Sequence, residues 1–88
     1  MFRLLISKCA AKQIPLLKAA HLDDRLKALL SLISENPFRN PPPYEKLIGD
    51  FSGLYSRRIN GKHRLVYEVD ETAKVIRVLS VWTHYETL

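Results

Sequence analysis

The 88-residue sequence is 47% hydrophobic and basic, with 14 lysine and arginine residues against nine aspartate and glutamate residues. A chain of this length forms one small domain, residues 1–88, and leaves no room for a large enclosed cofactor pocket. Its single cysteine, Cys9, excludes a disulfide framework and suits a reducing compartment. No segment has the apolar length of a membrane span and lysines interrupt the N-terminal apolar stretch, so we expect a cytoplasmic protein without a signal peptide.

The first 35 residues predict a strand followed by two helices. An apolar run over Phe2–Ile6 indicates the strand. Ser7 is expected to cap a first helix that runs toward His21, with a kink at Pro15. Apolar residues then recur at helical spacing over Leu22–Glu35, which predicts a second helix whose apolar face belongs to the core.

A proline-rich segment separates this helical part from a C-terminal β part. Asn40-Pro41-Pro42-Pro43 is expected to be stiff and extended and to deliver Tyr44 and Glu45 to one place, although composition alone is equally consistent with a surface spacer. Three strands are predicted at about residues 53–59, 63–69 and 75–85. The order β-α-α-β-β-β indicates an α+β domain, with two helices on one face of a mostly antiparallel sheet.

The register of the predicted hairpin decides which face its arginines occupy. Asn60-Gly61 is a two-residue turn signal, but that turn would mix apolar and charged residues on both faces. A three-residue connection, Asn60 to Lys62, sorts them better and places Arg58 and Arg64 on the open face. Arg57 then falls on the core side, from which its side chain is expected to snorkel to solvent.

Basic residues cluster between positions 57 and 64 without an intervening carboxylate. The cluster comprises Arg57, Arg58, Lys62, His63 and Arg64. Together with the net charge of +5, it has the electrostatic character of a nucleic-acid site, and a solvated basic edge is the alternative.

His84 and Tyr85 follow the last predicted strand directly. A histidine held at a strand end can exchange protons near neutral pH, and the neighbouring tyrosine can stack on a base. The alternative is a half-buried histidine with a satisfied hydrogen bond.

Several motifs together resemble the YoeB (Txe) toxins of the RelE superfamily. They are Glu45, Ser52-Gly53, Ser56-Arg57-Arg58-Ile59-Asn60, His63-Arg64-Leu65-Val66-Tyr67 and His84-Tyr85. The resemblance implies a RelE-like fold with a curved sheet. It also implies a bacterial, ribosome-dependent endoribonuclease that cleaves mRNA in the A site of the 30S subunit and is neutralised by a YefM-like antitoxin. Operator DNA would be bound only through the antitoxin complex, and the resemblance allows a homodimer.

The implied reaction can be compared with the chemistry that RNA cleavage needs. RNA supplies its own nucleophile, the 2′-OH, so the reaction needs a base, an acid and cations for the phosphate, but no metal and no cofactor. By the resemblance, Glu45 is the base and His84 the acid. Arg64 stabilises the phosphate with help from Arg58, and Tyr85 orients a nucleotide. Further RNA contacts are expected from Lys46, Arg57, Lys62 and His63.

Two departures from the family pattern concern contacts with RNA or the ribosome. A lysine often lies three residues after the catalytic glutamate, where this chain has Ile48, and Lys46 is the nearest substitute. Trp82-Thr83 replaces the basic-aromatic pair often seen before the terminal histidine.

Other readings remain open from the sequence. Glu45 could cap a turn, and Arg64 could pair with Glu68. A ParE-like toxin that inhibits DNA gyrase would share the architecture without cutting RNA, and an inactive relative could act only as a co-repressor with its antitoxin. A metal site finds no support, because the histidines and Cys9 lack ligand spacing.

Overall fold

A computed structural model describes residues 1–49 and 53–82 of the chain. Its elements are β1 (Arg3–Ile6), α1 (Lys8–Ala19), α2 (Asp23–Glu35), β2 (Glu45–Lys46), β3 (Leu54–Arg58), β4 (Arg64–Asp70) and β5 (Val75–Ser80). Ser52, His84 and Tyr85, which belong to the motifs quoted above, lie outside the described residues.

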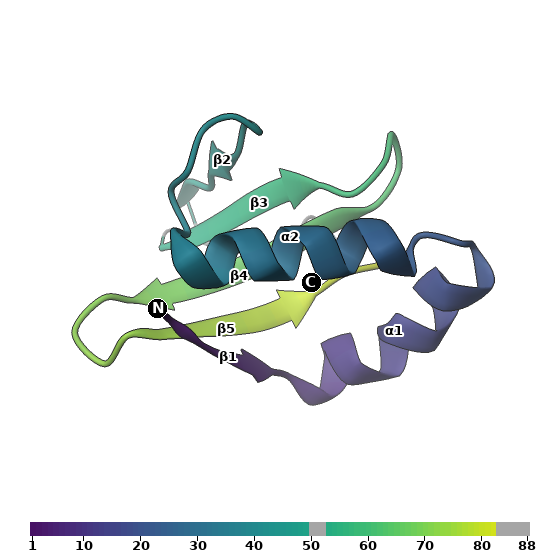
Figure 1. Cartoon of the computed structure of the whole chain (residues 1–88), viewed down its shortest axis with the longest axis horizontal. Coiled ribbons are helices and arrows are strands. Elements are labelled where there is room, and N and C mark those ends of the chain that lie inside the picture. The colour runs from purple at the N-terminus through teal and green to yellow at the C-terminus, as the bar shows by residue number, and fades with distance from the viewer. Residues whose placement is uncertain (50–52, 83–88) are drawn as a thin grey trace.

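The strands form one sheet in the order β1-β5-β4-β3-β2, with the helices packed against it (Figure 1). β1 pairs parallel with β5, and every other neighbouring pair is antiparallel. The predicted α+β architecture and the mostly antiparallel sheet are therefore confirmed. β2 was missed, because a two-residue strand of charged residues after a proline run carries no alternating pattern of its own.

Both helices bury one face against the sheet. Ala10 and Leu17 from α1, and Leu26 and Ile33 from α2, join one core with residues of the last three strands. Figure 1 shows α2 lying across the sheet in front of β4. Burial of this apolar surface is the main stabilising contribution of such a two-layer fold. Neither helix is long and apolar enough to cross a membrane, within the part of the chain that is described.

The ends of α1 follow from local chemistry. The Ser7 hydroxyl accepts a hydrogen bond from the Ala10 amide at 3.0 Å, so the predicted N-cap is confirmed. The helix includes Pro15 and ends at Ala19, short of the predicted His21. His21 has a φ of 60°, which lies in the left-handed region and cannot continue a right-handed helix.

The β3–β4 hairpin has the predicted register. Arg58 pairs with Arg64 and Arg57 pairs with Leu65, which leaves Asn60 to Lys62 as the connection. The Asn60 side-chain oxygen accepts hydrogen bonds from the amides of Lys62 and His63 at 2.9 and 2.7 Å. This local bonding by asparagine stabilises the three-residue connection in place of a tight two-residue turn.

β5 ends at Ser80, short of the predicted end at residue 85. The amides of Val81 and Trp82 bond to the side-chain oxygen of Gln13 from α1, at 2.8 and 3.2 Å. The backbone at the end of β5 is thus held by a helix side chain instead of by a neighbouring strand.

Candidate functional site

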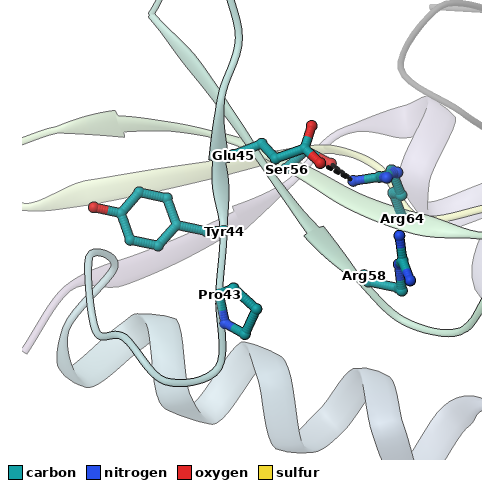
Figure 2. A pocket seen from close by; sticks show the side chains of 6 residues that line it. All are labelled: Pro43, Tyr44, Glu45, Ser56, Arg58 and Arg64. Atoms are coloured by element: carbon teal, nitrogen blue, oxygen red, sulfur yellow. Dashed lines mark hydrogen bonds and ion pairs between the residues drawn. The ribbon is translucent and has the colours of Figure 1, made fainter.

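A hollow of about 270 Å³ opens where β2, β3 and β4 lie side by side. Its lining residues are Pro43, Tyr44, Glu45, Ser56, Arg58 and Arg64 (Figure 2). The sheet register explains why they meet: Glu45 lies opposite Ser56, and Arg58 lies opposite Arg64. Ser56 and Arg58 are two residues apart on β3, so their side chains share a face with those of their partners.

The centre of this hollow is an ion pair between Glu45 and Arg64. Glu45 Oε1 lies 3.2 Å from Arg64 Nη1, and Figure 2 shows the two side chains pointing toward one another. The same nitrogen lies 3.4 Å from the hydroxyl of buried Ser56. Two alternatives for these side chains are wrong. Glu45 does not cap a turn, because it lies in a strand and pairs with Arg64, and Glu68 pairs with Arg77 instead of Arg64.

The two partners differ in exposure. The Arg64 side chain is 14% exposed, whereas the Glu45 side chain is 55% exposed. Arg64 is therefore a largely shielded cation with a fixed position, and Glu45 is a carboxylate that an incoming ligand can reach. A base in contact with solvent, next to a held cation and a second arginine, suits proton abstraction beside a phosphate.

Arg57 does not reach solvent, so the expected snorkelling is wrong. Its side chain is 1% exposed. The guanidinium donates hydrogen bonds to the carbonyls of Pro37, Arg39 and Pro42 at 3.1, 2.8 and 2.7 Å, and to the Tyr67 hydroxyl at 3.0 Å. Three backbone carbonyls and a phenol thus solvate the buried charge. With its donors committed in this way, Arg57 cannot serve as the surface RNA contact that the sequence analysis expected.

The same contacts place the segment before β2. The carbonyls that Arg57 binds belong to residues 37–42, which lead directly to Tyr44 and Glu45. The Arg57 guanidinium also lies 4.9 Å from the centre of the Tyr44 ring. The proline-rich segment is therefore anchored to the core, and the expectation that it delivers Glu45 to a defined place is confirmed.

Tyr67 completes this buried network. Its hydroxyl accepts from Arg57 and donates to the Pro37 carbonyl at 2.8 Å. Burial raises the pKa of Tyr67, while the hydrogen bond and the charge of Arg57 act in the opposite direction. The tyrosine keeps its proton at neutral pH, which the bond to Pro37 requires.

His63 is also buried, so its ring is not accessible for the RNA contact that was expected. The residue is 8% exposed, and its ring stacks on Trp82 with 4.0 Å between ring centres and 15° between planes. Its Nδ1 forms a hydrogen bond with the Trp82 carbonyl. Burial lowers the pKa of His63 below its usual 6.5, and the charge of Lys62 acts in the same direction.

The remaining predicted residues divide into two groups. Lys46, Arg58 and Lys62 are exposed, as a contact to RNA requires, and Ile48 is exposed as well. His84 and Tyr85 lie outside the described residues. Across residues 1–49 and 53–82, no three histidine, cysteine or acidic side chains gather closely enough to hold a metal ion.

Sequence reasoning missed two contributors to this region. Ser56 was assigned to the open face but not to a contact with Arg64, and Gln13 was not singled out. For Ser56, the sequence indicated only that it shares a strand face with Arg58, two residues away. The second joins residues far apart in sequence, and no local pattern could have indicated it.

Comparisons with known proteins agree on one family. A sequence profile described as a YoeB-like toxin of bacterial type II toxin-antitoxin systems matches residues 17–85. A toxin YoeB of Streptomyces coelicolor is 42% identical over 52 residues, which are 59% of this chain and 62% of that protein, slightly less than two thirds of its length. A toxin YoeB of Synechocystis is 36% identical over 62 residues, which are 70% of each chain.

Solved structures show the same similarity over nearly the whole chain. A YoeB/ParE toxin from Agrobacterium tumefaciens gives a TM-score of 0.86 at 26% identity, covering 96% of this chain and 100% of that one. A chain of the heterotetrameric YoeB-YefM complex from Staphylococcus aureus gives 0.79 at 31% identity, covering 97% and 99%.

Proposed function

This chain belongs to the YoeB-like toxin family of bacterial type II toxin–antitoxin systems, and from that premise we propose that it is a metal-independent endoribonuclease that cleaves mRNA in the ribosomal A site. The observation that carries the proposal is the Glu45–Arg64 pair in an open hollow on the sheet, with Arg58 beside it. A gyrase inhibitor or a co-repressor would not require a solvent-accessible carboxylate against a held arginine.

In the proposed reaction Glu45 takes the proton of the ribose 2′-OH, and the 2′ oxygen attacks the adjacent phosphorus. Arg64 and Arg58 neutralise the charge that builds on the phosphate oxygens. The 5′ oxygen of the next nucleotide leaves with a proton from His84, and Tyr85 orients a nucleotide. The products are a 2′,3′-cyclic phosphate and a 5′-hydroxyl end. RNA contacts outside the reacting atoms come from Lys46 and Lys62.

The shape of the site supports a role for the ribosome. The hollow is shallow and carries few groups, so this chain alone does little to hold an RNA strand in line for attack. Alignment of the reacting groups supplies a large part of the rate of such a reaction. We therefore assign the alignment of mRNA to the ribosomal A site and expect the free protein to cut RNA poorly.

A YefM-like antitoxin is the proposed protein partner. The similar S. aureus toxin was solved in complex with YefM and also as a dimer. An acidic segment of the antitoxin that folds on binding would neutralise the basic open face. Operator DNA would be bound through this complex.

The test is a reconstituted translation reaction followed by mapping of mRNA 5′ ends, with and without ribosomes. The wild-type protein should cut mRNA only when ribosomes are present, and His84→Gln should remove cutting while keeping the circular-dichroism spectrum. A gyrase supercoiling assay runs in parallel. Gyrase inhibition without cleavage would replace this proposal with the ParE-like function, and the absence of both activities in the wild type would leave the co-repressor function.

A further inference from the structure

A second hollow continues the candidate site on its other side. It measures about 340 Å³ and shares Pro43 and Arg58 with the first hollow. Its lining also includes Arg25 of α2 and the turn residues Asn60 and Gly61, which the first hollow does not share. A ligand that lies against Glu45 and Arg64 can therefore extend past Arg58 into this second hollow.

The second hollow is lined by cations, and none of its lining residues in the described part of the chain is a carboxylate. Its three charged residues are Arg25, Arg57 and Arg58. Among the described residues the ion pairs are Glu45–Arg64 and Glu68–Arg77, so none of these three arginines is neutralised by a carboxylate there. The Arg57 charge is buried on carbonyls, and a charge in such surroundings acts on its neighbourhood more strongly than one in water.

Arg25 is held in place at the rim. Its Nη1 donates a hydrogen bond to the Ile59 carbonyl at 3.2 Å, which ties the α2 side chain to the end of β3. The guanidinium has further N–H donors that this one bond does not use. An arginine fixed in this way loses less side-chain freedom when it contacts an anion.

We propose that the second hollow is a subsite for a phosphate of the RNA strand next to the scissile phosphate, with Arg25 as its contact residue. The proposal rests on the proposed endoribonuclease function and adds a site to it. A nucleic-acid strand fits better than an acidic protein segment because the hollow shares Pro43 and Arg58 with the one that holds Glu45 and Arg64. A strand that passes Arg58, which lines both hollows, would bring a neighbouring phosphate to Arg25.

The experiment compares single-turnover cleavage of ribosome-bound mRNA by the wild type and by Arg25→Gln. The mRNA carries either normal phosphates or an uncharged methylphosphonate, one linkage before or one linkage after the scissile phosphate. Lys27→Gln is the matched control, because Lys27 lies exposed on the same helix outside the hollow and the variant loses the same charge. Arg25→Lys, which keeps the charge, and thermal melting of each variant separate a local contact from a loss of folding.

Neutralising one of the two flanking linkages should slow the wild type by about fivefold at low salt, the size of an exposed ionic contact. Arg25→Gln should slow cleavage of normal mRNA by a similar factor. On the mRNA with that methylphosphonate, the variant should cleave no more slowly than it cleaves normal mRNA. The slope of log rate against log salt should fall by about one for Arg25→Gln. Lys27→Gln should match the wild type, and Arg25→Lys should recover part of the rate.

Three results would overturn the subsite. Wild-type rates that are equal on all three mRNAs would show that no flanking phosphate is bound, whatever the variants do. Equal slowing by Arg25→Gln and Lys27→Gln would show that the rate depends on net charge and not on a contact made by Arg25. Weaker antitoxin binding by Arg25→Gln with unchanged cleavage would make the hollow a protein contact. Absence of cleavage by the wild type would instead refute the proposed function itself, and the subsite with it.

Discussion

At the scale of single residues, the unequal exposure of Glu45 and Arg64 sets what each can do. The arginine is shielded and bonded to both Glu45 and Ser56, so its position is nearly fixed before any ligand arrives. The carboxylate is more than half exposed and can release Arg64 to an incoming phosphate at small cost, because exposed ion pairs contribute only about 0–1 kcal/mol. Preorganisation therefore lies mainly on the cationic side of the site.

Glu45→Gln should remove the proposed general base while leaving the fold intact. Loss of a general base typically lowers a rate by roughly 10²–10⁴-fold. Stability should change by less than about 1 kcal/mol, since the lost ion pair is partly exposed. Glu68→Gln is a matched control, because the Glu68–Arg77 pair has the same length, within 0.1 Å, on the same sheet. Single-turnover cleavage on ribosomes and urea unfolding measure both effects, and a Glu45→Gln rate within threefold of wild type would exclude Glu45 as the base.

At the scale of elements, the buried Arg57 joins the sheet to the segment that carries Glu45. Arg57→Ala should leave three loop carbonyls without their donors and open a cavity, so the free energy of unfolding should fall by about 3–5 kcal/mol. Arg57→Lys keeps the charge but not the planar fork, and should lose less. Tyr67→Phe removes the phenol alone and should cost about 1–2 kcal/mol.

Urea unfolding of these three variants orders the effects, and Arg58→Ala is the control because that side chain is exposed. If Arg57→Ala were no less stable than Arg58→Ala, the anchoring of residues 37–42 by Arg57 would be wrong. The burial of Arg57 also shows why a charge reversal at this position cannot report on RNA or antitoxin binding: it would disrupt the core first.

His63, which directly precedes β4 and stacks on Trp82, is a pH-sensitive group. The pKa of His63 is lowered in the folded state, so between that value and 6.5 the unfolded chain binds more protons. The His63 contribution to stability is therefore complete above about pH 6.5–7. It is lost as the pH falls from about 6.5 toward the lower pKa that His63 has in the folded state. The free energy of unfolding should drop on acidification from pH 7.5 to 5.5, and His63→Gln should reduce this slope. His21→Gln, at an exposed position, should keep it; equal slopes in all three proteins would contradict the assignment.

The sequence predicted elements whose pattern is local and missed those that depend on distant partners. The β3–β4 register followed from alternation alone, because only one pairing sorts Tyr55, Leu65 and Tyr67 away from Arg58 and Arg64. The position of β2, the burial of Arg57 and the end of β5 depend on partners in other segments, up to 69 residues away. For the candidate site, the family resemblance identified Glu45 and Arg64, and the fold then brought them together. The roles of His84 and Tyr85 stay predictions.

At the scale of the whole molecule, the net charge of +5 and the open basic face should govern association with the antitoxin. Exposed charges of opposite sign speed diffusional encounter, and salt screens them over about 8–10 Å. Arg58→Glu combined with Lys62→Glu should slow association about tenfold or more at low salt and flatten its dependence on salt. Dissociation should change less, because apolar contacts at the centre of an interface are not screened.

Arg3→Glu combined with Lys74→Glu is the matched control. It changes the net charge equally, but at the β1 edge of the sheet, which is at the opposite end of the strand order from β2. Arg3 and Lys74 are neighbours there, because the Arg3 amide donates a hydrogen bond to the Lys74 carbonyl. Stopped-flow association at several salt concentrations separates the two variants. An equal slowing by both would mean that net charge alone steers the encounter. An unchanged rate for the Arg58 and Lys62 variant would place the antitoxin away from the candidate site, so that inhibition would have to act without covering Glu45 and Arg64.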